Sequence, residues 1–260
     1  MVNKFEDDDK FEINKTPWYK GKTLLQALEQ LKQPIRLINK PLRISLFKVI
    51  SIVGIGPVLI GIIKSGILKK NMPIFITAPY NEFNCVKTKS ISIVKFNESL
   101  DVAIPGDIVG IKIKSDNEKF RYIGVFILND YKKGKINSPI IGNYEKNFSI
   151  NVEKFTAIID IMNINKPIKI GFCPVIYCHT TLVRVKIIEI IKKIDRRTNK
   201  IISKNLYELK NGERAFVVLN VLKKFVCEKY KDNPYLGAFV MRDNNRMIAV
   251  GKIIEIIRTE

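Results

Sequence analysis

The sequence lacks the residue combinations on which most enzyme chemistry depends. It contains a single histidine, His179, and its aspartates cluster only at positions 7–9, so neither histidine-based catalysis nor a working pair of acid/base carboxylates is expected. The four cysteines include no CxxC pair, which argues against a disulfide scaffold and favours buried, reduced thiols. Cys173 and Cys178 precede His179 at a metal-like spacing, but no fourth ligand follows at a suitable separation. We therefore expect no metal site, and we interpret His179 as a structural residue in a strand turn.

Membrane-spanning and phosphate-binding segments are missing as well. Residues 49–63 carry no charge, but a bilayer-spanning helix needs about 20 apolar residues. Gly56 and Gly61 have the spacing of a phosphate loop, yet isoleucine follows the second glycine where Lys and Ser/Thr would reach phosphates and magnesium. No GxxxxGK(S/T) motif and no DxxG–NKxD pair occurs in the 260 residues. The run is instead interpreted as two strands joined by a tight Gly-x-Gly turn, with a second turn at residues 64–66.

Positive charge is what the chain has in excess. Lys and Arg number 45 against 25 Asp and Glu, which is a formal net charge of +20. Such a charge attracts polyanions, namely RNA, DNA or an acidic membrane surface. Compositional bias is the alternative explanation for part of it, because Lys, Ile and Asn are abundant together. The N-terminus shows neither an apolar signal segment nor an Arg-rich targeting pattern, so we expect a cytoplasmic protein.

Hydrophobic residues make up 46% of the chain, which is enough for real cores. The length of 260 residues leaves room for one large domain or two smaller ones. Ile and Val dominate the apolar residues, and their branched side chains favour strands. A short helix is predicted at residues 23–32, because Thr23 and Gln26 form a capping box and leucines recur on one face. Pro34 ends it.

From residue 42 the hydrophobic pattern changes to the period of β-strands. Gly and Pro turn signals, such as Ile104-Pro105-Gly106, divide this region into short segments. Several short strands without helices between them indicate a closed antiparallel barrel. The expected strands are residues 42–52, 57–63, 73–78, 85–94 and 107–114.

A second β-rich block begins at about residue 153. Its most informative strand is 181–194, in which valines alternate with Arg184 and Lys186 before isoleucines continue in the opposite phase. Such a phase change predicts a bulge or a sharp bend, by which barrels turn corners. A charged hairpin loop is expected at residues 195–200. The expected strands are residues 155–162, 173–178, 181–194, 213–220, 221–230, 237–242 and 247–257.

The sequence therefore predicts an all-β fold of two tandem antiparallel β-barrels with a short N-terminal linker helix. No α/β domain is expected, because no long helical segments separate the strands. The predicted divisions are residues 1–38 for the tail and linker helix, 39–130 for the first barrel, 131–152 for an exposed linker and 153–260 for the second barrel.

Specific motifs then occur in one order along nearly the whole chain. They are TPWYKGKTLLQALEQL (16–31), NKPLRISL (39–46), VGIGPVLIGIIKSGILKKNM (53–72), AIPGDIVG (103–110), CHT (178–180), KIDRRTNK (193–200), NPYLGAFVMRD (233–243) and AVGKI (249–253). Together they resemble the second and third domains of eukaryotic and archaeal translation elongation factor 1-alpha, an EF-Tu-like family, with the linker helix that precedes them. The resemblance implies two β-barrels, as the strand pattern does.

In that family the GTP-bound protein delivers aminoacyl-tRNA to the ribosome. The resemblance therefore implies aminoacyl-tRNA and the ribosome as partners, with a G domain in trans or a nucleotide exchange factor as further ones, and no membrane. The family's GTP-binding domain has no counterpart in these 260 residues, so we expect no GTP hydrolysis and no cofactor, since GTP and magnesium would belong to that domain. Two alternatives stay open: a protein-interaction module like the barrel pair of the release-factor GTPase, or a truncated product without independent function.

Basic residues of the second barrel are the candidate tRNA-binding positions, because proteins recognise A-form stems through phosphate and 2′-OH contacts. They are Lys192, Lys193, Arg196, Arg197 and Lys200 around one hairpin, with Arg242 and Arg246 in the closing motif around NPYLGAFVMRD (233–243). The alternative is that the hairpin cations are merely solvated. The turn residues expected to be structural are Gly54, Gly56, Gly61, Gly66, Pro105 and Gly106.

Polar surface positions depart from the family's pattern, whereas barrel-forming glycine, proline and apolar positions match it. Lys48 replaces an acid in the family's PLQDVYKI segment, and it would repel an aminoacyl ammonium group. The family's GRVETG loses its arginine to Ile62 and its acid to Lys64, and LGRF loses its arginine to Ala238. These changes leave the expected fold intact and weigh against full affinity for aminoacyl-tRNA.

Overall fold

The computed structural model describes residues 18–77, 85–114, 140–142, 152–244 and 246–257. The chain divides into two units, residues 1–35 and 36–260. In the first unit, helix α1 (Leu24–Glu29) is capped by Thr23, whose hydroxyl accepts a hydrogen bond from the Gln26 N–H (3.3 Å) while the Gln26 side chain accepts one from the Thr23 N–H (3.1 Å). The predicted capping box is confirmed. The helix ends three residues earlier than predicted, and none of its residues is buried.

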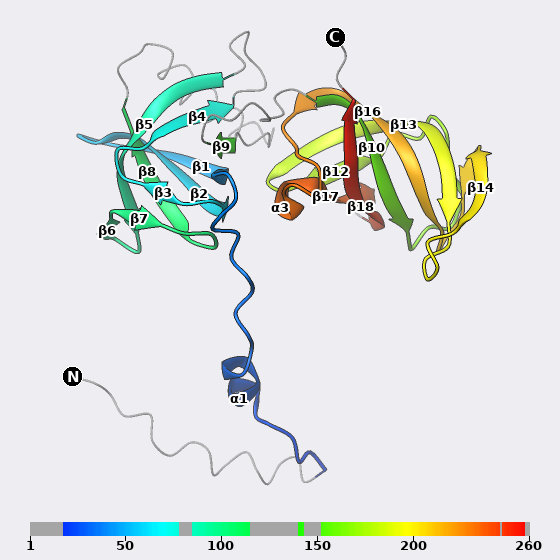
Figure 1. The fold of residues 1–260 in the computed structure, drawn as a ribbon, viewed down its shortest axis with the longest axis horizontal. Coiled ribbons are helices and arrows are strands. Elements are labelled where there is room, and N and C mark those ends of the chain that lie inside the picture. The colour runs from blue at the N-terminus through cyan, green and yellow to red at the C-terminus, as the bar shows by residue number, and fades with distance from the viewer. Residues whose placement is uncertain (1–17, 78–84, 115–139, 143–151, 245, 258–260) are drawn as a thin grey trace. The chain divides into compact units, whose positions relative to one another are not determined.

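The strands of the first barrel run from residue 43 to residue 142. They are β1 (Arg43–Ile52), β2 (Gly56–Ser65), β3 (Leu68–Lys69), β4 (Pro73–Thr77), β5 (Cys85–Lys95), β6 (Glu98–Leu100), β7 (Val102–Ala103), β8 (Ile108–Ile113) and β9 (Ile140–Gly142). Around the ring the order is β4, β9, β1, β2, β8 and β5, and β5 pairs back with β4, so the barrel is closed (Figure 1). All pairings are antiparallel.

The strands of the second barrel occupy residues 152–257. They are β10 (Val152–Ile161), β11 (Ile168–Lys169), β12 (Val175–Cys178), β13 (Thr181–Ile194), β14 (Ile201–Leu206), β15 (Glu208–Leu209), β16 (Arg214–Phe225), β17 (Ala238–Asp243) and β18 (Arg246–Ile257), with the short helix α3 (Pro234–Gly237) before β17. The ring order is β12, β17, β18, β10, β16 and β13, and β13 pairs back with β12. The predicted all-β fold of two antiparallel barrels is confirmed.

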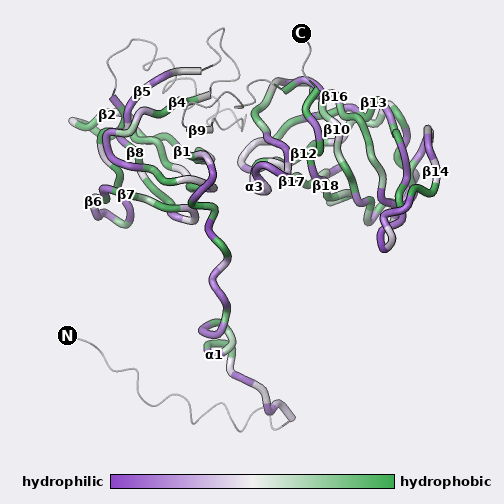
Figure 2. The backbone as a smooth tube through the Cα atoms, in the orientation of Figure 1, coloured by the Kyte–Doolittle hydropathy of each residue, from purple (hydrophilic) through white to green (hydrophobic). Residues whose placement is uncertain are grey.

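Alternating side chains fill the interior of each ring. Along β10 every second residue from Phe155 to Ile161 is buried, and the ring of Phe155 meets those of Phe225 and Phe239 at centroid separations of 6.1 and 5.9 Å. Figure 2 shows hydrophobic residues along the strands of both barrels and hydrophilic residues at the turn between β13 and β14. Each barrel therefore has its own core.

The predicted bend in the long strand β13 is confirmed. Its pairing with β16 shifts in register between Ile187 and Glu189 and again between Ile190 and Lys192. Buried positions change phase there, because Ile187 and Ile190 both face the core although they are three positions apart. The bulges let one strand pair with β12, β16 and β14 in turn.

Two expectations for the strands need correction. The predicted strands 213–220 and 221–230 form one strand, β16, because apolar pairing with β10 and β13 continues past residue 220 and the chain leaves the sheet only after Phe225. The strand β14 was not predicted. Within the segment 131–152, expected to be a linker, residues 140–142 form β9 and pair with β1 and β4; residues 131–139 and 143–151 lie outside the described residues.

The uncharged run at residues 49–63 folds as predicted. It forms the β1–β2 hairpin, with a turn at residues 53–55 and a bend at Gly66. Among the described residues, no helix is long and apolar enough to cross a membrane.

Candidate functional site

The charged hairpin between β13 and β14 is held together by the side chain of Asp195. Its Oδ1 accepts hydrogen bonds from the Arg197 N–H (2.9 Å), the Thr198 N–H (2.7 Å) and the Thr198 hydroxyl (3.0 Å). The hydrogen bond from the Thr198 N–H is the main reason why the pKa of the Asp195 carboxyl lies below its usual value. Asn199 takes a left-handed φ of 55°, which asparagine tolerates well. The loop therefore has one preferred shape and carries its basic residues on the surface.

Two of the predicted hairpin cations make ion pairs with neighbouring strands. The Arg196 Nε lies 3.2 Å from the Asp160 Oδ1, and its Nη2 donates to the Ile161 carbonyl (3.2 Å) at the end of β10. The Lys193 Nζ lies 2.5 Å from the Glu213 Oε1, next to the start of β16. These two side chains attach the hairpin to the barrel.

The other three hairpin cations are placed differently. The Lys192 Nζ lies 4.3 Å from the centroid of the Phe216 ring, which is a cation–π contact. Arg197 and Lys200 are exposed at the loop. These two residues are therefore the hairpin positions best placed to meet a phosphate backbone.

The closing motif lies at the same end of the barrel as the hairpin. One cross-strand row runs through Ile194, Arg214, Asp160, Val250 and Val240. Because β13 and β17 run in the same direction, the turn that follows β17 and the hairpin that follows β13 leave the barrel at one end. Arg246 is exposed at that turn.

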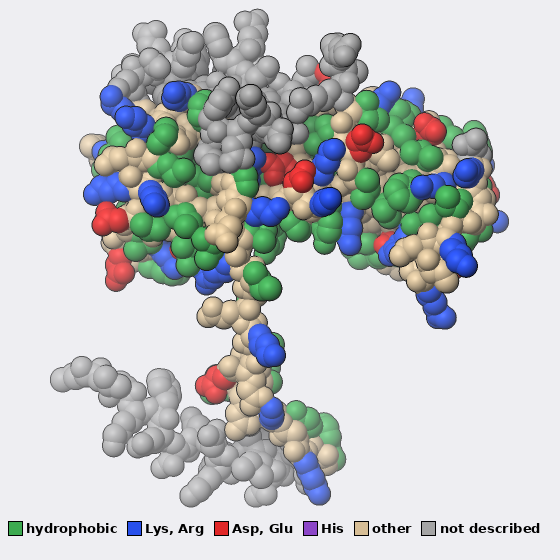
Figure 3. Space-filling view, viewed as in Figure 1, with side chains coloured by type: hydrophobic (Ala, Val, Ile, Leu, Met, Phe, Trp, Pro, Cys, Tyr) green, Lys and Arg blue, Asp and Glu red, His purple; other side chains and the backbone are tan. Residues whose placement is uncertain are grey.

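Arg242, the second residue predicted in the closing motif, faces an aromatic ring. Its guanidinium carbon lies 5.2 Å from the centroid of the Tyr177 ring on β12. On the face seen in Figure 3, Lys and Arg side chains are spread over the surface, whereas Asp and Glu side chains are confined to a few places. The surface charge therefore follows the excess seen in the sequence.

Asp160 binds two arginines, Arg214 and Arg196, at this end of the barrel. Arg214 donates from Nε and Nη2 to its two carboxylate oxygens (2.7 and 2.8 Å), and Arg196 contacts it from the hairpin. Burial opposes the charged carboxylate, but the hydrogen bonds and charges of the two arginines outweigh it and lower the pKa of Asp160. Sequence reasoning missed both Asp160 and Glu213, because a single acid in the sequence carries no sign of its partner.

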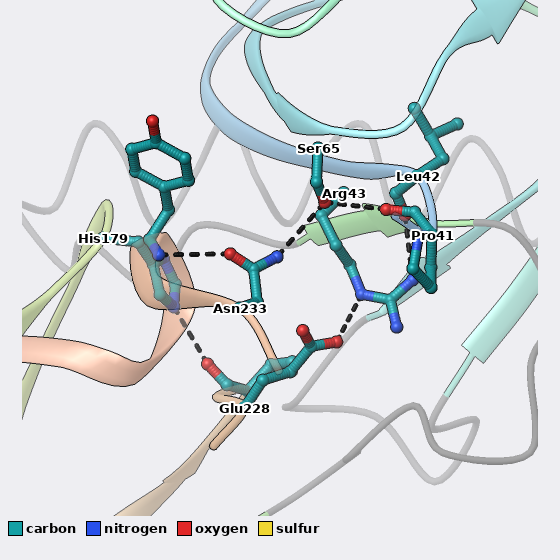
Figure 4. A network of polar contacts seen from close by, with 9 residues as sticks. Pro41, Leu42, Arg43, Ser65, His179, Glu228 and Asn233 are labelled. Carbon is teal, nitrogen blue, oxygen red and sulfur yellow. Dashed lines mark hydrogen bonds and ion pairs between the residues drawn. The ribbon is translucent and has the colours of Figure 1, made fainter. Parts of the chain in front are cut away.

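A buried polar network joins β1 of the first barrel to residues that follow β16 in the second (Figure 4). Arg43 is only 3% exposed and donates from Nε to the Glu228 carboxylate. Burial raises the pKa of the Glu228 carboxyl, and the charge of Arg43 opposes that rise. The Asn233 Nδ2 donates to the Ser65 Oγ (3.2 Å), and the Ser65 hydroxyl donates to the Pro41 carbonyl (2.7 Å). The two barrels thus satisfy each other's buried polar groups.

Lys64, which stands where the family has an acid, lies at this junction. Its Nζ lies 5.7 Å from the centroid of the Tyr235 ring in α3 of the second barrel. Partial burial lowers the pKa of Lys64. Asn233 caps α3 by accepting a hydrogen bond from the Tyr235 N–H (3.1 Å). Lys64 therefore contacts a residue of the second barrel from the end of β2.

His179 occupies the turn between β12 and β13, as predicted, with a left-handed φ of 47°. Its Nε2 lies 2.9 Å from the Val226 carbonyl, and burial lowers the pKa of the ring to about 4. The imidazole is therefore neutral at pH 7 and donates from Nε2. Burial raises the pKa of the Cys178 thiol to about 12. Within the described ranges, no group of three or more His, Cys, Asp or Glu side chains could hold a metal ion.

The turn residues singled out in the sequence lie at turns and close contacts. Gly66 has a φ of 71°, and a Cβ there would lie 2.5 Å from the backbone of Leu42. Gly61, which was expected at a turn, lies within strand β2, where a Cβ would lie 2.9 Å from the Ser45 carbonyl oxygen. The Pro105 carbonyl accepts a hydrogen bond from the Arg36 Nη1 (3.0 Å). The remaining turn glycines have positive φ and are Gly54, Gly56 and Gly106.

Comparisons with known proteins agree with these motifs. The GTP-eEF1A C-terminal domain-like family matches residues 154–254. The elongation factor 1-alpha of Plasmodium falciparum (isolate K1 / Thailand) is 36% identical over 258 residues, which cover 99% of this chain and 54% of that protein. The elongation factor 1-alpha of Desulfurococcus mucosus is 38% identical over 245 residues, covering 92% of this chain and 50% of that protein. The chain is homologous to elongation factor 1-alpha.

This relative of elongation factor 1-alpha spans about half the length of the curated proteins that it matches. A crystal structure of sup35 complexed with GMPPNP has the same fold, with a TM-score of 0.69 at 22% identity over 93% of this chain and 54% of that one. The family match at residues 154–254 includes the basic hairpin and the closing motif. RNA binding by their basic residues stays a prediction.

Proposed function

We propose that this chain is a translation-factor barrel pair that binds aminoacyl-tRNA through the basic end of its second barrel. Homology to elongation factor 1-alpha along nearly the whole chain carries this proposal. The exposed positions of Arg197, Lys200 and Arg246 at one end of the barrel support it. Lys and Arg side chains on a fixed loop suit the phosphates of an A-form stem, which are recognised by shape and charge.

The geometry divides four of the five predicted hairpin cations into two pairs. Arg196 and Lys193 hold the hairpin through Asp160 and Glu213. Arg197 and Lys200 lie on the loop that Asp195 has already ordered. Little conformational entropy would be lost when such a loop meets RNA, which favours binding.

Delivery to the ribosome is the finer part of the proposal, with a G domain acting in trans or an exchange factor as further partners. We infer a cytoplasmic site of action. We also propose that the chain does not hydrolyse GTP, since its 260 residues contain no phosphate-loop motif. Incubation with radiolabelled GTP should release no phosphate above the protein-free control, and turnover that survives purification would contradict this.

Filter binding of the chain to aminoacylated tRNA tests the main proposal. Replacing Arg197 and Lys200 by Gln should weaken binding and make the slope of log affinity against log salt concentration less steep by about 1–2. The reason is that fewer counterions are released from the RNA when fewer phosphate contacts form. Replacing Lys169 and Lys186, exposed elsewhere on the barrel, by Gln removes the same charge and should change the slope little. Equal losses in both double variants would show attraction by net charge alone, and failure to bind tRNA at low salt would overturn the proposal.

A further inference from the structure

The outer face of the second barrel carries an apolar patch where strands β12, β17, β18, β10 and β16 lie side by side. Antiparallel strands with one face in water normally carry polar residues outward. Several outward positions in register are hydrophobic here: Tyr177 pairs with Val240 and Val240 with Val250, while Ile158 pairs with Phe216. Charged residues lie between these two groups, since Ile158 pairs with Lys252 and Val250 with Asp160. Outward positions early in β13 are Arg184 and Lys186, both exposed. The apolar patch is therefore confined to one side of this barrel.

A hollow of about 410 Å³ opens on this face. The apolar and aromatic side chains around it include Tyr177, Tyr230, Val240, Val250 and Ile158. Its volume lies within the range of pockets that accept a bound group. Ala238 also lines it, and an arginine at that position, as in the family's LGRF motif, would extend a long side chain where this chain leaves space.

The charges around the hollow are mainly positive. The Lys252 Nζ lies 4.5 Å from the centroid of the Tyr230 ring, and Arg242 stacks on Tyr177. Asp160 is the carboxylate that lines the hollow, and both of its oxygens already accept hydrogen bonds from Arg214. A group that approaches this face therefore meets an apolar centre beside two cations.

We propose that this face docks an acidic protein partner, which inserts an apolar or aromatic side chain into the hollow and places carboxylates against Lys252 and Arg242. An apolar anchor in a pocket with a charged rim is the usual arrangement of a binding hot spot. The alternative occupant, single-stranded RNA, needs open aromatic faces on which bases stack, whereas the rings of Tyr177 and Tyr230 each already have a cation over them. The proposal does not depend on tRNA binding.

Chemical-shift mapping of the full-length, ¹⁵N-labelled chain tests this with a defined probe. The probe is the peptide acetyl-Glu-Asp-Phe-Leu-Asp-Glu-amide, and its matched control carries Lys at all four acidic positions. The acidic peptide should shift amide signals of β17 and β18 and keep most of its affinity when salt is raised, because an apolar anchor is not screened. The lysine peptide should shift none of them.

Two variants separate occupancy of the hollow from simple attraction by charge. Ala238→Arg adds a cation, so charge alone predicts tighter binding of the acidic peptide, whereas a filled hollow predicts binding at least about tenfold weaker. Lys252→Met should weaken binding up to about fivefold, the size of an exposed ion pair. Lys186→Met on β13 is the matched control and should leave the affinity unchanged. Circular dichroism checks that each variant is folded.

The opposing outcomes are distinct. Unchanged or tighter binding by the Ala238→Arg variant overturns the proposal in favour of general electrostatics. Equal binding of the lysine peptide overturns the requirement that the partner be acidic. If a single-stranded RNA shifts the same amides and displaces the peptide, this face binds nucleic acid and the proposal is wrong. Absence of any shift with the acidic peptide also overturns it.

Discussion

Gly66 shows how the absence of a side chain lets two segments of backbone lie close together. Its φ of 71° is left-handed, and a Cβ would press against the Leu42 backbone at 2.5 Å. We expect Gly66→Ala to lower the free energy of unfolding by ~3 kcal/mol or more, since backbone strain and an unyielding contact add together. Gly54 also has a positive φ (79°) but open space around it, so Gly54→Ala should cost only about 1–2 kcal/mol. Urea denaturation of the two variants measures the difference, and equal losses would contradict the steric argument.

The buried ring of His179 predicts a pH dependence of stability. Its folded pKa of about 4 lies below the value near 6.5 of an unfolded histidine. Between those values the unfolded chain binds a proton that the folded chain does not, so the stabilisation is complete above about pH 6.5 and is lost as the pH falls toward 4. We expect the free energy of unfolding to drop by about 1–3 kcal/mol across this window. In His179→Asn the slope between pH 6.5 and 4.5 should flatten, and an unchanged slope would assign the effect to other groups.

Individual cations could be recognised from the sequence, but their partners could not. Lys193 and Arg196 are placed in the hairpin as predicted, yet the carboxylates that bind them lie elsewhere in the chain, Glu213 just before β16 and Asp160 on β10. Only the pairing of β10, β13 and β16 brings these groups together. The ion pairs of Lys193 and Arg196 therefore separate these two residues from Arg197 and Lys200, which look equivalent in sequence.

Among the elements, prediction succeeded where a strand is long and patterned. The bulges of β13 could be predicted from its phase change, because its fourteen residues show two runs of alternating burial. Strand β9 has only three residues, Ile140–Gly142, and no period can be read from so short a segment. Its strand character comes from its neighbours, since it pairs with β1 on one side and β4 on the other.

Strand β9 should be essential to the first barrel in spite of its length. The side chain of Ile141 is fully buried in that core. We expect Ile141→Ala to cost about 2–5 kcal/mol of unfolding free energy. Ile202→Ala in β14 removes the same atoms from a side chain that is 56% exposed, and should change stability by no more than about 0.5 kcal/mol. Similar midpoints for the two variants in urea would show that β9 does not close the barrel.

At the scale of residues 36–260, the buried network should make the two barrels unfold together. Loss of Arg43 leaves Glu228 buried without its partner, which costs about 3–5 kcal/mol; loss of Asn233 removes its hydrogen bond with Ser65. We expect differential scanning calorimetry to show one transition for the wild type and two for the Arg43→Ser, Asn233→Ala double variant. A wild type that already melts in two steps would mean that the junction does not couple the barrels.

The same junction sets an order of events in time. Arg43 and Glu228 are 185 positions apart in the chain, so at about 5–20 residues per second a ribosome makes the arginine roughly 10–40 s before its partner. Throughout that interval the guanidinium, which is only 3% exposed in the folded chain, lacks the carboxylate of Glu228, and its charge has to stay solvated. The first barrel can therefore assemble its strands early, but it reaches its final buried surface only after the second barrel has been synthesised.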